Sequence, residues 1–87
     1  MHEASLIAGL LRAVEAVASE QGGGKVVGVA VKLGALSHIS LQHFRDHFAR
    51  EAKGTILDGA RLDIEVLTDT ADARAQGVVL ESVELEV

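Results

Sequence analysis

The chain of 87 residues contains no cysteine, no Trp and no Tyr, and it has only two Phe. Without cysteine, neither a disulfide framework nor a thiolate zinc site can form. Because large aromatic side chains are so scarce, the core has to be aliphatic, with Phe44 and Phe48 as its two large members. A chain of this length buries roughly 60% of its extended surface, so we expect residues 1–87 to form a single domain.

Positive charge is also scarce, since eight Lys and Arg residues stand against thirteen Asp and Glu. The basic residues are scattered, whereas nucleic-acid binding needs them clustered, so we expect no nucleic-acid partner. No apolar run approaches the length of a membrane span, and the N-terminus lacks the charged region and cleavage site of a signal peptide. These features favour a cytoplasmic protein without a membrane partner.

Two stretches have helical periodicity. From Ala4 to Gln21 apolar residues recur at the three-and-four spacing of one helix face, and the glycines at 22–24 end this predicted helix. A second helix is predicted before Lys53 and Gly54, and either Ser37 or Ser40 can cap its start. Its expected apolar stripe consists of Leu41, Phe44, Phe48 and Ala52.

Three stretches read as strands. Residues 25–34 (KVVGVAVKLG) are rich in valine, residues 60–67 (ARLDIEVL) alternate strictly, and residues 78–87 (VVLESVELEV) follow a polar loop at 68–76. In the first strand we expect two faces, one with Val27, Val29, Val31 and Leu33 and the other with Val26, Gly28, Ala30 and Lys32. A bulge near Glu81 and Ser82 can shift the facing of the last strand.

The predicted order is therefore α-β-α-β-β, an α/β (α+β) fold. A strand, helix, strand unit favours parallel pairing with a right-handed crossover, and the last strand can return antiparallel. We expect a three-stranded mixed β-sheet with two α-helices packed on one face. The expected solvent-facing side carries Lys32, Asp63, Glu65, Glu84 and Glu86.

Four segments carry a family resemblance: MHEASL at 1–6, KLGALS at 32–37, KGTILDGARLDIE at 53–65 and VELEV at 83–87. In this order they resemble the HypA/HybF family of hydrogenase nickel-insertion accessory proteins. The resemblance implies a nickel-binding domain of the same element order, with a small zinc domain inserted between the last two strands. In this chain the short loop at 68–76 stands at that place, so we expect no structural zinc.

The histidine at position 2 offers three nitrogens in chelating order, namely the α-amine of Met1 and the amide and imidazole of His2. Nickel(II) accepts square-planar or tetragonal nitrogen fields. The resemblance adds coordination by the backbone amides of His2 and Glu3, so Met1, His2 and Glu3 are the expected Ni(II) site. Affinity should fall as imidazole and amine protonate, near pH ~6.5 and ~7.7–8.

Other residues near this site are less defined. Many relatives carry an acidic residue at the position of Ser40, where this chain has a hydroxyl, and His38 is a candidate auxiliary ligand. His43 and His47 lie four apart on the second predicted helix, but HFRDH lacks the glutamate of the zinc metalloprotease motif. We interpret these two histidines as solvated helix surface.

The resemblance implies a nickel metallochaperone of [NiFe]-hydrogenase maturation that works with a GTPase and delivers metal to the hydrogenase large subunit. No catalytic constellation is evident, so we expect no enzyme. The alternative is an interaction or regulatory module, a paralogue or an engineered deletion, that lacks the zinc domain and docks to maturation partners without efficient nickel transfer. An acylphosphatase-like enzyme is disfavoured because an arginine-rich phosphate loop is missing. Exposed sheet edges favour a homodimer.

Overall fold

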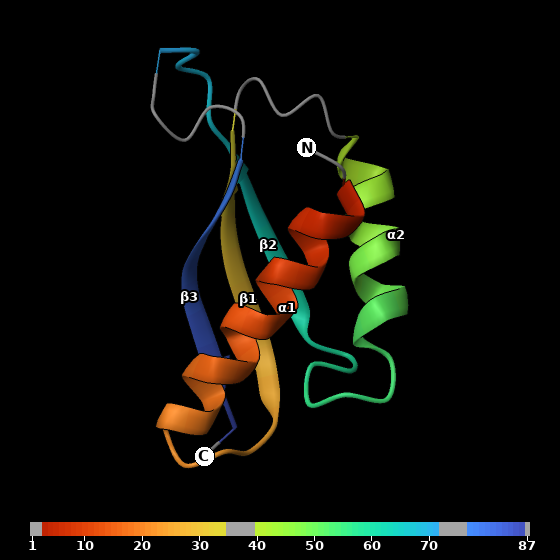
Figure 1. Cartoon of the computed structure of the whole chain (residues 1–87), viewed down its shortest axis with the longest axis vertical. Helices are drawn as coiled ribbons and strands as arrows, with labels where there is room; N and C mark the ends of the chain where they lie inside the picture. The colour runs from red at the N-terminus through yellow and green to blue at the C-terminus, as the bar shows by residue number, and fades with distance from the viewer. Residues whose placement is uncertain (1–2, 35–39, 72–76, 87) are drawn as a thin grey trace.

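The computed structural model describes residues 3–34, 40–71 and 77–86 and confirms the predicted order of elements (Figure 1). None of the helices in these three ranges is long and apolar enough to span a membrane. The elements are α1 (Glu3–Glu20), β1 (Val26–Leu33), α2 (Leu41–Ala52), β2 (Arg61–Val66) and β3 (Val78–Leu85).

The three strands form one mixed sheet in the order β2-β1-β3. β1 pairs with β2 in parallel and with β3 antiparallel, as predicted from the strand, helix, strand unit and the returning last strand. Both helices lie on the same face of this sheet (Figure 1). The prediction of a three-stranded mixed sheet with two helices on one face is therefore confirmed.

The core lies between this face and the helices. Phe44 and Phe48 of α2 are 0% and 3% exposed, which confirms them as the large core side chains. No polar or charged side chain is buried among the residues that the structure describes. The remaining core is aliphatic and comprises Ile7, Leu10, Val14, Ala18, Val26, Val29, Val31, Leu33, Ala52, Leu57 and Leu62.

One facing prediction was wrong, at the start of β1. Val26 was expected on the outer face with Gly28, but it is 0% exposed, whereas Val27 is half-buried. The pairing with β3 shifts register between Val26 and Gly28. An extra residue at such an irregularity reverses the alternation on its N-terminal side, so Val26 joins Val29 and Val31 in the core.

The bulge expected in β3 is present. Ala30 pairs with Ser82 and the next residue, Val31, pairs with Leu80, so Glu81 has no partner in β1. The apolar stripe of α2 is shorter than predicted, because Leu41 is 44% exposed. Leu41 is the first residue of the helix and lies almost one turn ahead of Phe44, outside the buried stretch.

The end of α1 shows why the glycine triplet terminates a helix. The amide of Gly23 donates to the carbonyl oxygen of Ala18 at 2.7 Å, and the amide of Gly22 donates to that of Ser19 at 3.1 Å. Gly22 has φ +98°, in the left-handed region that glycine adopts without steric cost. This pair of bonds is the Schellman motif, which satisfies the last carbonyls of the helix.

The outer face of the sheet is bridged by one side chain. Arg61 of β2 donates to Glu84 of β3 at 2.9 Å and to Asp63 at 2.8 Å. Its guanidinium passes over Gly28 of the central strand, where a Cβ would lie 2.5 Å from Arg61 Nη2. A glycine in mid-strand therefore makes room for an ion pair that joins the two edge strands.

Candidate metal centre

The expected nickel site is placed only in part by the structure. Glu3 is the first residue of α1, whereas Met1, His2 and His38 lie outside the described residues. The starts of α1 and α2 lie at the same end of the molecule (Figure 1). Glu3, at the start of α1, and Ser40, which caps the start of α2, therefore lie at the same end of the molecule.

Ser40 has a structural role of its own at the start of α2. Its backbone is extended, with φ −68° and ψ 130°, and its hydroxyl oxygen accepts a hydrogen bond from the amide of His43 at 3.4 Å. This is the geometry of an N-cap, which satisfies one of the amides that a helix start leaves without a partner. Of the two predicted caps, Ser40 is thus confirmed, and Ser37 lies outside the described residues.

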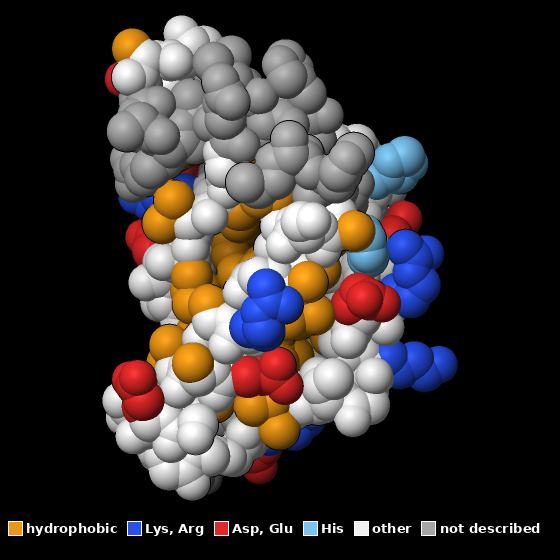
Figure 2. Space-filling view, in the orientation of Figure 1, with side chains coloured by type: hydrophobic (Ala, Val, Ile, Leu, Met, Phe, Trp, Pro, Cys, Tyr) orange, Lys and Arg blue, Asp and Glu red, His pale blue; other side chains and the backbone are white. Residues whose placement is uncertain are grey.

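A second group of polar side chains lies on the outer side of α2. A shallow hollow of about 310 Å³ is lined by His43, Asp46, His47 and Arg50. The histidine side chains in the described part of the chain lie near each other on this helix (Figure 2). The side-chain amide nitrogen of Gln42, Nε2, donates to Asp46 Oδ1 at 2.9 Å and so restrains that carboxylate.

This hollow is not a complete metal cage. Within residues 3–34, 40–71 and 77–86 there is no group of three or more His, Cys, Asp or Glu side chains placed to hold a metal ion. His43 is exposed and His47 is half-buried, and His47 also takes part in an interaction within the protein. Any metal bound here would have two histidine ligands and would draw its other ligands from water.

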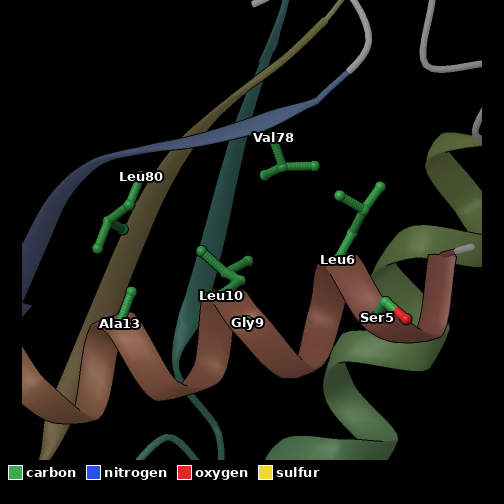
Figure 3. A pocket seen from close by; sticks show the side chains of 7 residues that line it. All are labelled: Ser5, Leu6, Gly9, Leu10, Ala13, Val78 and Leu80. Carbon is green, nitrogen blue, oxygen red and sulfur yellow. The ribbon is translucent and has the colours of Figure 1, made fainter. Parts of the chain in front are cut away.

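An apolar groove lies on the opposite side of the helical layer, between α1 and β3 (Figure 3). It encloses about 230 Å³, and Leu6 and Leu10 face Val78 and Leu80 across it. None of the described residues that line it is charged, so these residues offer no metal ligand and no acid or base. The groove was not predicted from the sequence, although Gly9, a glycine within the helix, lines it without a side chain.

Gly9 itself yields a prediction. A Cβ built on Gly9 would meet nothing within 4 Å, and glycine inside a helix costs about 1 kcal/mol relative to alanine. We expect Gly9→Ala to raise the free energy of unfolding by about 0.5–1 kcal/mol, measured by urea denaturation. Ala13→Gly, at the exposed position one turn further along α1, is the matched reverse change and should lower it by a similar amount. Destabilisation by Gly9→Ala would show that the groove tolerates no added methyl group.

Among the titratable groups in the described part of the chain, the one with a clearly shifted pKa is Arg61 of the edge strand β2. The hydrogen bond to Asp63, followed by that to Glu84, raises the pKa of Arg61 above its ordinary value. All three side chains are more than half exposed. Arg61 therefore acts as a permanent cation that links the strands, and the arrangement has the character of a structural tie rather than an acid or base centre.

Comparison with known proteins supports the resemblance seen in the sequence. Residues 1–86 match the protein family described as HypA, hydrogenase/urease nickel incorporation, metallochaperone. The hydrogenase maturation factor HypA of Chlorobaculum tepidum is 37% identical over 65 residues, 75% of this chain and 58% of the relative. The factor of the same name from Desulfitobacterium hafniense is 39% identical over 67 residues, 77% of this chain and 59% of the relative.

Solved structures give the same fold. The solution structure of the Ni metallochaperone HypA from Helicobacter pylori matches with a TM-score of 0.80 and 19% identity, over 98% of this chain and 97% of that chain. A second solution structure of a HypA protein matches with a TM-score of 0.74. The matched part of the chain spans about three fifths of the length of the curated relatives named above. Since the family match extends over residues 1–86, the chain belongs to the HypA family.

Proposed function

We propose that this protein is a nickel-binding metallochaperone that takes part in [NiFe]-hydrogenase maturation. It binds Ni(II) at Met1, His2 and Glu3 and, together with a GTPase, passes the metal toward the hydrogenase large subunit. Family membership supports the class of function. The observation that supports a metal site at this position is the start of α1 at Glu3, because the helix begins within the MHE segment at residues 1–3.

The donor set suits nickel chemically. The first four amides of a helix have no acceptor within it, so the amide of Glu3 is not committed to a helical hydrogen bond. The amine of Met1 and the amide and imidazole of His2 supply further nitrogens, and Ni(II) accepts such a field. Ser40, already engaged as a cap, is assigned no metal bond, and His38 is the auxiliary ligand of this proposal.

Electrostatics sets a condition on this site. A helix start carries partial positive charge, which favours an anion there and opposes a divalent cation by roughly 0.3–1 kcal/mol at exposed positions. Amide nitrogens that lose their protons to the metal bring compensating negative charge, and the Glu3 carboxylate adds to it. Because protons are released on binding, nickel is held more weakly as the pH falls, which suits a protein that hands its metal on.

A second candidate function rests on the connection between β2 and β3. Only residues 67–77 join the two strands, both strands pair with β1, and the chain has no cysteine. The zinc domain that the family resemblance implies at this point is thus not encoded there. A protein that docks to maturation partners, or forms a homodimer through a sheet edge, without efficient nickel transfer fits this feature.

Nickel titration separates the two functions. We compare, by calorimetry, a chain that begins with Met1 and the same chain with Gly-Ser added ahead of Met1. We expect one tightly bound Ni(II) in the first and an affinity at least about tenfold lower in the second, because the extension removes the amine from the chelate. The two proteins should have the same circular dichroism spectrum and melting temperature.

Either alternative result is informative. Equal nickel affinity in the two proteins would exclude the amine of Met1 as a ligand. A chain that binds no Ni(II) in either form, while it still associates with the maturation GTPase, would overturn the metallochaperone proposal and leave the interaction module.

A further inference from the structure

The hollow on α2 brings together two histidines that the proposed nickel site does not use. His43 and His47 are separated by one helical turn, and both line the same hollow. Side chains four residues apart on a helix have Cβ atoms about 5–6 Å from each other. That separation allows two imidazoles to meet on one ion at the usual metal–nitrogen distance of about 2.0–2.1 Å.

The helix that carries the pair is held firmly. Phe44 and Phe48 follow directly after His43 and His47, and both phenylalanines are buried in the core. Since the phenylalanines fix the rotation of α2, the two histidines are kept on its outer side. The pairing is thus a property of the packed helix.

We propose that His43 and His47 form a second site on this protein, for a divalent transition-metal ion. The ion has two imidazole ligands, and water completes its coordination, since the described residues supply no cluster of three or more metal-ligating side chains. Imidazole suits Ni(II), Cu(II) and Zn(II), whereas Mg(II) and Ca(II) prefer oxygen ligands. The site thus recognises the same class of ion as the proposed N-terminal site but does not depend on it.

Neighbouring charges influence the metal affinity of the site formed by His43 and His47. Asp46, restrained by Gln42, contributes a negative charge to the hollow, and Arg50 contributes a positive charge that opposes the metal. His47 also has an interaction within the protein with which a metal has to compete. A site with two protein ligands under these conditions binds more weakly than a chelate of several nitrogens, so it is suited to transient loading. Affinity should follow the order Cu(II) above Ni(II).

The test uses the full chain with His2→Ala, which removes the proposed N-terminal site. Ni(II) is titrated into this protein by calorimetry, and the imidazole NMR signals of His43 and His47 are followed. We expect one weakly bound Ni(II) per chain, selective changes in both imidazole signals, and a rise in melting temperature at saturating metal. Adding His43→Gln or His47→Gln should weaken binding by about tenfold or more, since each removes half of the protein ligands.

Two controls keep the result unambiguous. Glu51→Gln alters an exposed residue of the same helix outside the hollow and should change affinity by less than about twofold. Circular dichroism verifies that α2 remains folded in the glutamine variants. The proposal is overturned if His2→Ala chains bind no Ni(II), or if binding is unchanged by both glutamine substitutions. A different result is expected if only the proposed N-terminal site does not exist. Wild-type and His2→Ala chains would then each bind one Ni(II), with equal affinity.

Discussion

Replacement of His2 by alanine is expected to lower the affinity of the N-terminal site for Ni(II) by at least about 100-fold. Substitution of a residue that only orients a metal ligand already lowers metal affinity by about 10- to 100-fold, and His2 is proposed as a ligand itself. Loss of the imidazole removes the neutral nitrogen that anchors the metal while neighbouring amides lose their protons. Calorimetry with Ni(II) measures the effect.

The fold should not respond to this change. Residue 2 precedes α1, which begins at Glu3, and the buried residues of that helix start at Ile7. The melting temperature of the metal-free His2→Ala chain should therefore match that of the wild type. His43→Gln is the matched histidine control, because it should leave the tight N-terminal site intact. A His2→Ala chain that keeps the wild-type nickel affinity would contradict the assignment of His2.

Phe44→Ala is expected to lower the free energy of unfolding by about 3–5 kcal/mol. Phe44 is 0% exposed and is the largest fully buried side chain, in a core that otherwise holds one more phenylalanine and aliphatic residues. Loss of the phenyl ring leaves a cavity that the neighbouring side chains cannot fill, because the sheet and helices fix their positions. Since small domains are stabilised by only about 5–15 kcal/mol in total, the variant should be close to unfolding.

Urea denaturation followed by circular dichroism checks this prediction. Leu41→Ala is the matched control, since Leu41 belongs to the same helix and is 44% exposed. It should cost less than about 1 kcal/mol. Similar losses in the two variants would show that the buried position of Phe44 is not what stabilises the domain.

Features that depend on a few consecutive residues were predictable from the sequence. The glycines after α1 form the expected helix stop, Ser40 caps α2 as one of two proposed residues, and the alternating pattern of residues 60–67 became an edge strand. The bulge at Glu81 was also foreseen, because the apolar alternation of the last strand breaks there. In each case the physical signal is local, since capping, turn formation and the alternation of polar and apolar residues involve neighbouring positions.

For the candidate nickel site, the sequence predicted which residues take part but not their arrangement in space. The MHE segment and the family resemblance identify the residues, and the pattern from Ala4 onward predicts a helix directly after them. The pairing of His43 with His47 was visible as a spacing, but the hollow that both histidines line was not. The groove beside Gly9 likewise needs β3, a strand more than sixty residues further along the chain, to form its other wall.

The sequence by itself determined the order of the elements, the C-terminal ends of α1 and α2, the aliphatic core around Phe44 and Phe48, and the residues proposed for nickel. Only the tertiary structure decided that Val26 turns inward and that Arg61 reaches Glu84 across Gly28. The physical reason is register. Strand pairing joins residues far apart in the chain, and a shift of one position moves a side chain to the other face, whereas helix stops and caps depend only on nearby residues.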